Sequence, residues 1–302
     1  MTDPNAMAIV GVDCRFPEAR GPQEFWRNIA EGRVAVHELD PKDLRAAGLT
    51  DEEIAAPDYV TRAARLEGAE DFAAEFFGYS PAEAESTDPQ QRLFLETCWG
   101  ALEAAGHAAS AGSLMTGVFA GSGPSTYMTA LQVDRARTGG VLSAVDDLGL
   151  HLGGLPDYLA SRVAYKLDLR GPSVSLQTAC SSALTAVHHA TLSLLSGECD
   201  LALAGGACVV EPLLGYRYRP GDIQSRDGYC RPFDAMSTGT SFSSGVGVVV
   251  LRRLADALAD GDRVLAVVRG TAVGNDGAAR SGFTAPSPAG VARVVSAALG
   301  VA

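Results

Sequence analysis

The segment spanning residues 173–197 constrains the fold most, because it joins a short strand to a long apolar helix through a turn of small residues. Its sequence is SVSLQTACSSALTAVHHATLSLLSG. Ser173–Gln177 is predicted to be a strand, and the helix that follows the turn is predicted to reach Leu195 and to end at Gly197. A strand, a sharp turn and an apolar helix in succession are typical of an α/β fold.

The rest of the chain continues this alternation. Further strands are predicted at Met7–Val12, Thr116–Ala120, Leu201–Ala204, Val246–Leu251 and Arg263–Val268. Helices are predicted at Pro22–Glu31, from Pro89 (capped by Asp88) to Ala105, at Pro156–Lys166, at Ala255–Ala259 and at Val291–Leu299. Residues 37–85, 135–155 and 212–242 are expected to be irregular. Val-rich strands between helices favour an α/β fold with a largely buried sheet.

Charge and cysteine usage restrict the functional classes. The 302 residues carry a net charge of −12, whereas a nucleic-acid-binding surface needs basic side chains and an anionic membrane repels acidic ones. No run approaches the ~20 apolar residues of a spanning helix, and no signal peptide is visible. The six cysteines are scattered, without CxxC spacing, and no HxxxH is present. We therefore expect a cytoplasmic protein with reduced thiols and no metal, nucleic-acid or membrane partner.

Cys180 stands in the turn at which the helix is predicted to begin. Unpaired backbone N–H groups and the helix dipole favour a thiolate at such a position. An ordinary thiol has a pKa of about 8.5, so little of it is ionised at neutral pH without such help. Its small neighbours leave room for a substrate to reach the sulfur, and they are Ala179, Ser181, Ser182 and Ala183. Cys180 is thus a candidate nucleophile, and the alternative from position alone is a buried structural cysteine.

Several motifs, in order along the chain, resemble those of one known family. They are AIVGVDCRFP at 8–17, FFG at 76–78, DPQQR at 88–92, TACSSA at 178–183, YCRPFDA at 229–235 and NDG at 275–277. TACSSA is similar to the nucleophile motif of β-ketoacyl synthases, in particular the ketosynthase domains of modular type I polyketide synthases. The resemblance covers essentially the whole chain.

The resemblance implies an α/β, thiolase-like fold of two related halves. Residues 1–262 would form the N-terminal half, and residues 263–302 would supply only the first strand and helix of the second half. Cys180 would accept an acyl chain from the phosphopantetheine arm of an acyl carrier protein, with its own amide as half of an oxyanion hole. No permanently bound cofactor is implied. The family is usually dimeric through the strand that corresponds to Ser173–Gln177.

The resemblance also implies two histidines and a lysine for decarboxylation of a malonyl-type extender and for condensation. None of the five histidines stands in the matching HGTGT-, KSNIGH- or NGH-like contexts, and the sequence ends at Ala302 before them. His188 and His189 follow Cys180 by more than two helical turns, so we expect one in the core and one at a packing surface. We therefore expect a ketosynthase component whose C-terminal part comes from another polypeptide or a paralogue.

Two alternatives stay open beside this hypothesis. The protein could be a non-condensing acyltransferase, or an inactive scaffold that dimerises with an active ketosynthase. Arginines at 217, 219, 226 and 231 could steer an acidic carrier protein, or could pair locally with Asp222, Asp227 and Asp234. Tyr127 and Met128 could line a substrate channel or could pack in the core.

Overall fold

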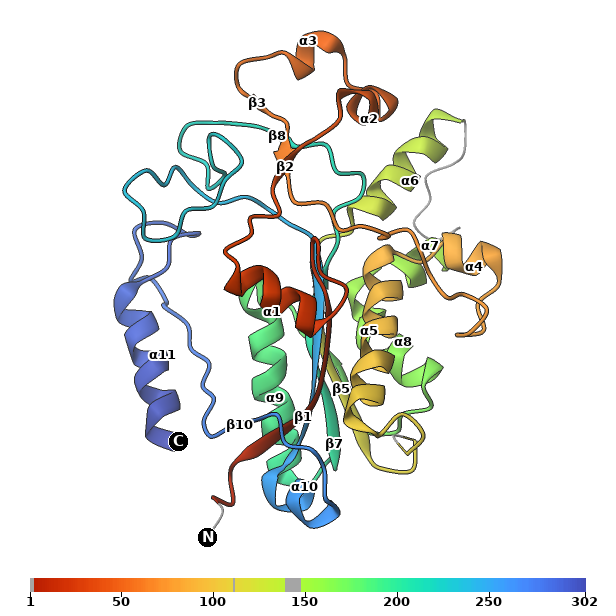
Figure 1. Cartoon of the computed structure of the whole chain (residues 1–302), viewed down its shortest axis with the longest axis vertical. Helices are drawn as coiled ribbons and strands as arrows, with labels where there is room; N and C mark the ends of the chain where they lie inside the picture. Colours follow the sequence, from red (N-terminus) through yellow and green to blue (C-terminus); the bar gives the residue numbers. More distant parts are fainter. Residues whose placement is uncertain (1–2, 111, 139–147) are drawn as a thin grey trace.

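The computed structural model describes residues 3–110, 112–138 and 148–302, with a six-stranded mixed sheet at the centre (Figure 1). The strand order is β10-β1-β9-β7-β5-β6. The bounds are β1 Met7–Arg15, β5 Thr116–Ser122, β6 Ser173–Ser175, β7 Leu201–Cys208, β9 Gly245–Arg253 and β10 Ala266–Val268. β5 is parallel to β6 and β7, whereas β9 is antiparallel to both β7 and β1. The carboxyl ends of β5, β6 and β7 therefore lie together at one end of the sheet.

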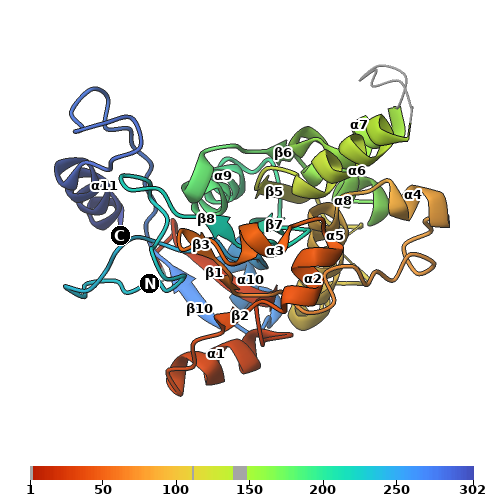
Figure 2. The ribbon, with the colours of Figure 1, turned by 90° about the horizontal axis from the view of Figure 1, so that it is seen from above.

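Helices cover both faces of this sheet, as the alternating pattern predicts. α5 (Pro89–Ala105) and α8 (Leu159–Lys166) pack on one face, and α9 (Ser182–Ser196) packs on the other (Figure 2). Two hydrophobic clusters result, one under α5 and α8 and one under α9. The predicted α/β fold with a buried sheet is confirmed.

Local signals set the bounds of α5. The Asp88 carboxylate accepts a hydrogen bond from the Gln90 backbone N–H at 2.7 Å, and Pro89 occupies the first helical position. Gly106 ends the helix in the left-handed conformation, with φ 76°. These are the capping residues that the sequence predicts.

The remaining elements are shorter or lie farther from the sheet. The helices are α1 Pro22–Ala30, α2 Pro41–Ala46, α3 Asp51–Ile54, α4 Pro81–Glu85, α6 Thr126–Arg137, α7 Leu148–Gly154, α10 Leu254–Asp260 and α11 Pro288–Val301, with 3₁₀ turns η1 Pro156–Tyr158 and η2 Ala179–Ser181. Two small sheets pair β2 His37–Glu38 with β4 Arg62–Ala63, and β3 Tyr59–Val60 with β8 Tyr216–Arg217. None of the helices in the described ranges is long and apolar enough to cross a membrane.

The expectation of an irregular segment at 135–155 is wrong at both of its ends. α6 continues to Arg137 and α7 occupies Leu148–Gly154, whereas 139–147 fall outside the described residues. Gly153 and Gly154 of α7 allow close packing instead. A Cβ at Gly153 would stand 1.9 Å from the Ser86 carbonyl oxygen, so only glycine permits this close approach.

The last two elements differ in how they join the molecule. β10 pairs antiparallel with β1 and extends the central sheet. α11 stands apart from the sheet, and Gly290 is its single buried residue (Figure 1). Its apolar side chains Val291, Val295 and Leu299 are exposed. The stretch after residue 262 thus contributes one strand and one largely uncovered apolar helix.

Candidate active site

Cys180 lies where the carboxyl ends of three parallel strands meet. β6 ends at Ser175, and Cys180 follows in the 3₁₀ turn η2, directly before α9. Its side chain is exposed. The sequence predicts this strand, turn and helix, and the structure confirms their order. In open α/β sheets this end of the strands is where ligands bind.

The turn that presents Cys180 holds one residue in a rare backbone conformation. Ala179 has φ 55°, in the left-handed region that residues with a Cβ seldom adopt. Such a conformation costs roughly 1–2 kcal/mol and persists only where surrounding contacts impose it. Strain of this kind gathers at functional sites. Among the described residues, only Glu18, Asp168 and Phe233 share it with Ala179 outside the glycines.

Four hydroxyl groups brace this turn. The Ser182 Oγ accepts a hydrogen bond from the Thr178 N–H at 2.9 Å and donates to the Ala179 carbonyl oxygen at 2.8 Å. The Ser181 Oγ donates to the Thr178 carbonyl oxygen at 2.9 Å. The Thr178 and Thr185 hydroxyls stand 3.1 Å apart and share a hydrogen bond. The loop on either side of Cys180 is therefore fixed by side chains.

Glycines in the sheet let the turn and the start of α9 sit close to the strands. A Cβ at Gly121 would lie 2.5 Å from the Ser182 Cβ and 2.6 Å from the Leu176 carbonyl oxygen. A Cβ at Gly206 would lie 3.2 Å from the Ala183 Cβ. The backbone of the sheet itself is thus the support on which the Cys180 turn rests.

The buried Gln90 side chain connects the loops that follow β5 and β7. The Gln90 Nε2 donates to the Gly123 carbonyl oxygen at 3.3 Å, and its Oε1 accepts from the Val209 N–H at 3.3 Å. Asp88 is 1% exposed, and this burial raises the pKa of its carboxyl group. The start of α5 thereby fixes the segments that follow β5 and β7.

A second cysteine lies near the candidate nucleophile. Burial raises the pKa of the Cys208 thiol, and the charges of Asp88 and Cys180 raise it further. A Cβ at Gly123 would stand 2.8 Å from the Cys208 Sγ. Cys208 is half-buried and Cys180 is exposed, so Cys180 is the more accessible thiol of the two. Sequence spacing gave no sign of this pair, because Cys208 ends a different strand.

The two histidines of α9, His188 and His189, are not positioned as partners of Cys180. The His188 Nδ1 lies 2.8 Å from the Thr271 Oγ1, and His189 is exposed. The expectation that one of the two faces the core is therefore wrong: α9 turns both toward its outer side, while Ala186 and Ala190 face the sheet. Burial, and then His189, lower the pKa of His188.

The two lesser candidates have separate outcomes. Arg231 pairs with Asp227 at 2.9 Å, as the local-pairing alternative predicts, and Arg217 pairs with Asp58 at 3.1 Å. The ion pairs of the described residues include neither Arg219 nor Arg226. Met128 is buried, which fits core packing, and the Tyr127 hydroxyl donates to the Glu85 carbonyl oxygen at 2.7 Å.

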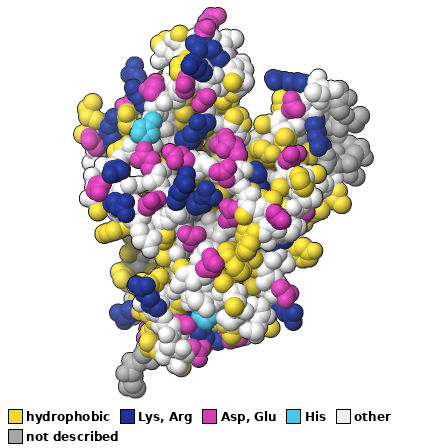
Figure 3. Space-filling model, turned by 45° about the vertical axis from the view of Figure 1, so that its right-hand side comes forward, with side chains coloured by type: hydrophobic (Ala, Val, Ile, Leu, Met, Phe, Trp, Pro, Cys, Tyr) yellow, Lys and Arg dark blue, Asp and Glu magenta, His cyan; other side chains and the backbone are white. Residues whose placement is uncertain are grey.

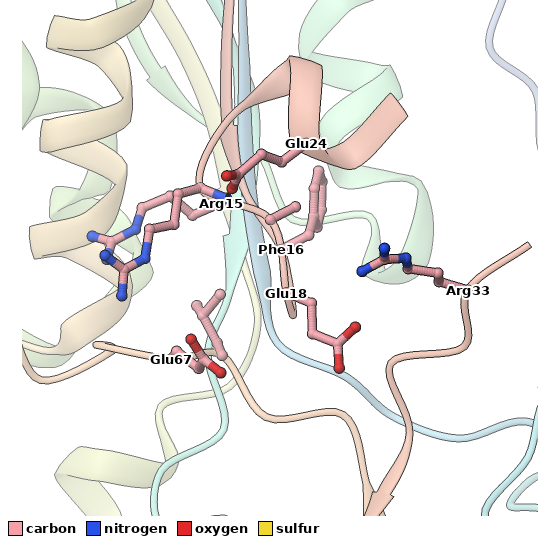
Figure 4. A pocket seen from close by; sticks show the side chains of 9 residues that line it. Arg15, Phe16, Glu18, Glu24, Arg33 and Glu67 are labelled. Atoms are coloured by element: carbon pink, nitrogen blue, oxygen red, sulfur yellow. Dashed lines mark hydrogen bonds between the residues drawn. The ribbon is translucent and has the colours of Figure 1, made fainter. Parts of the chain in front are cut away.

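A pocket of about 600 Å³ lies between the end of β1, α1 and the loop at 66–67, and no residue of the Cys180 turn lines it (Figure 4). Arginine and glutamate side chains line it in equal number. Arg15 is engaged by Glu96 at 3.2 Å, and the backbone N–H of Arg20 donates to Glu24. On the face drawn in Figure 3, basic and acidic side chains are similarly intermixed. The pocket is therefore lined by charges of both signs, and at least Arg15 already has an ion-pair partner.

Comparison with known proteins identifies the family. The family model described as "Beta-ketoacyl synthase, N-terminal domain" matches residues 5–257. The chain belongs to the β-ketoacyl synthase family. A component of the phenolphthiocerol/phthiocerol polyketide synthase of Mycobacterium tuberculosis is 46% identical over 296 residues, which cover 97% of this chain and 20% of that protein. The polyketide synthase PksN of Bacillus subtilis is 37% identical over 295 residues, 96% of this chain and 5% of that protein.

Solved ketosynthases share the fold. Ketosynthase twelve of the bacillaene polyketide synthase of Bacillus amyloliquefaciens superimposes with a TM-score of 0.87 at 34% identity, covering 98% of this chain and 52% of that one. The oxazolomycin ketosynthase domain OzmH KS7 of Streptomyces albus gives 0.82 at 36% identity, covering 98% and 51%. The predicted thiolase-like fold of a polyketide synthase ketosynthase is confirmed. The ketosynthase chain described here spans about half the length of these solved structures.

Proposed function

We propose that this chain is the acyl-accepting component of a polyketide-synthase β-ketoacyl synthase, with Cys180 as the acceptor. The observation that carries the proposal is the exposed thiol on a strained, hydroxyl-braced turn at the start of α9, a helix that packs on the central sheet. The same turn lies at the carboxyl ends of parallel strands, where a substrate can reach it.

The acyl transfer follows from the chemistry of a thiol. The Cys180 thiolate attacks the carbonyl carbon of an acyl group held as a thioester on the phosphopantetheine arm of a carrier protein. The tetrahedral oxyanion gains a hydrogen bond from the Cys180 amide. Its collapse breaks the bond to the arm, whose thiolate takes up the proton that Cys180 has lost. A thioester on Cys180 and a free arm result, and no resident cofactor is needed.

Condensation needs catalytic groups in addition to Cys180. A malonyl-type extender would lose CO₂, and its carbanion would attack the Cys180 thioester, with the histidines and lysine implied by the family resemblance. We propose that a C-terminal ketosynthase segment, or a paralogue, packs on the second half that begins at residue 263. The uncovered apolar side chains of α11 and Leu184 of α9 suit such a partner. Dimerisation through β6, which ends the sheet, belongs to the same proposal.

The proposal is tested by intact-mass measurement after incubation with acyl-pantetheine thioesters. The wild-type chain should gain one acyl mass, and Cys180→Ala should gain none. Cys230→Ala removes another exposed thiol and should leave the adduct unchanged. If Cys180→Ala and the wild-type chain acylate equally, Cys180 is not the acceptor. Absence of any adduct would favour an inactive scaffold.

A non-condensing acyltransferase is the second candidate. It is favoured by the complete acceptor turn in a chain whose histidines make no contact with Cys180 in the described residues. Co-expression with a ketosynthase C-terminal segment separates the two candidates. Decarboxylation of a malonyl thioester that appears only in the co-expressed complex supports the condensing component, and acyl transfer without decarboxylation supports the second candidate. Under either candidate function, we place the protein in the cytoplasm, where its six free thiols remain reduced.

A further inference from the structure

We infer that Ser182 is a positioning residue, whose hydroxyl holds Ala179 in its left-handed conformation and thereby aims the Cys180 sulfur. The inference rests on the proposed role of Cys180. It starts from one side chain that bonds to the backbone on both sides of Ala179.

The geometry gives the Ser182 Oγ two distinct tasks. It accepts a hydrogen bond from the backbone N–H of Thr178, the residue before Ala179, and it donates one to the carbonyl oxygen of Ala179 itself. Ser182 is 7% exposed, and the Ala179 carbonyl oxygen also accepts a hydrogen bond from the Ser182 backbone N–H, so residue 182 fixes this carbonyl through both its backbone and its side chain. A relaxed, right-handed Ala179 would turn its carbonyl away from this hydroxyl. The two hydrogen bonds therefore compensate the strain at φ 55°.

The position of Ser182 is itself imposed from below. A Cβ at Gly121 would lie only 2.5 Å from the Ser182 Cβ, so the Ser182 side chain occupies the space that a side chain at residue 121 would need. The hydroxyl therefore has little freedom to follow the turn if the turn relaxes. Ser181, one residue earlier, is exposed and bonds only to Thr178, so it leaves the Ala179 carbonyl untouched.

The test combines Ser182→Ala with Ala179→Gly. Glycine adopts positive φ without a steric cost, so it should replace the action of the serine. We expect Ser182→Ala to lower the maximal rate of Cys180 acylation from an acyl-pantetheine thioester about 10- to 100-fold, at unchanged half-saturation. The double variant Ala179→Gly/Ser182→Ala should recover most of that loss.

Ser193→Ala is the matched control. Ser193 is a buried serine of the same helix, and its hydroxyl bonds to Glu198 at 2.9 Å, far along α9 from the turn. This variant should lose some thermal stability and keep the acylation rate. Two results would overturn the inference. One is an acylation rate of Ser182→Ala equal to that of the wild type, and the other is a double variant that acylates no faster than Ser182→Ala.

A second readout separates this inference from the proposed function. If the wild-type chain accepts no acyl group, the proposed function fails, and the labelling rate of Cys180 by iodoacetamide relative to Cys230 is measured instead. Ser182→Ala should change that ratio and Ala179→Gly should restore it. Equal ratios in all variants would refute the positioning role.

Discussion

Gly121 shows at the scale of one residue how the sheet shapes the turn that carries Cys180. Its missing side chain provides the space for the Ser182 Cβ and the Leu176 carbonyl oxygen. The latter belongs to the strand-to-turn connection, so one position on β5 supports both sides of the turn. Any side chain at 121 has to displace backbone as well as Ser182.

Gly121→Ala should therefore weaken both folding and acylation. The new Cβ would meet atoms at 2.5 and 2.6 Å, and overpacking of this kind costs about 1–3 kcal/mol. We expect the free energy of unfolding in urea to fall by that amount and the acylation rate of Cys180 to fall with it. Gly300→Ala is the control, because a Cβ there meets nothing within 4 Å and alanine favours the helix. Equal stability of the two variants would contradict the expectation.

At the scale of one element, α5 depends on a buried cap. Asp88 closes the helix start, and Gln90, two residues later, reaches the loops after β5 and β7. Weakening the first turn of α5 should therefore disturb the loops that follow both strands.

Asp88→Ala and Asp88→Asn separate the cap from the charge. Alanine removes the acceptor of the Gln90 N–H, and we expect a loss of about 1–2 kcal/mol in the free energy of unfolding. Asparagine keeps an acceptor oxygen, and burial already disfavours the ionised carboxylate, so its loss should be much smaller. Urea unfolding of both variants at neutral pH measures the difference. Equal losses would mean that the charge, and not the cap, stabilises the helix.

The elements that sequence predicts well are those with local signals. α5 has its capping residues, α9 has an apolar pattern closed by Gly197, and β9 is Val-rich. α7 was missed because its glycines lower helix propensity, and the contact of Gly153 with Ser86 that explains them is tertiary. Propensity and pattern thus predict elements whose ends and packing are encoded within a few residues.

The same division holds for the candidate site. Cys180 could be found because a strand, a turn and a helix adjoin in sequence. Gln90 and Val209 are 119 residues apart, and Cys208 lies on another strand, so no spacing rule connects them to the turn. The left-handed Ala179 was equally hidden, since alanine carries no preference for that conformation.

At the scale of the whole molecule, buried thiols make stability sensitive to alkaline pH. Burial raises the pKa of the Cys14 thiol to about 11, and it also raises the pKa of Cys98, Cys199 and Cys208. In the unfolded chain these thiols ionise first. The stability contributed by the protonated native thiols is complete below about pH 9 and is lost as the pH rises through the folded values.

Cys14→Ala should flatten this dependence. We expect the urea midpoint of the wild-type chain to fall between about pH 8 and pH 11, and to fall less steeply in the variant, because one titrating group is gone. Cys230→Ala, which removes an exposed thiol, is the control and should keep the wild-type slope. A Cys14→Ala slope as steep as that of the wild type would rule out the contribution of Cys14.

The seating of α9 on bare sheet backbone has a mechanical consequence. Gly121 and Gly206 pack directly against Ser182 and Ala183. A shift of the start of α9 toward the sheet would therefore press these residues against the strand backbone. The turn that carries Cys180 is therefore held close against the sheet. On the proposed function, the acyl donor has to reach Cys180 and arrive correctly oriented, so the length and flexibility of the donor's tether govern the encounter.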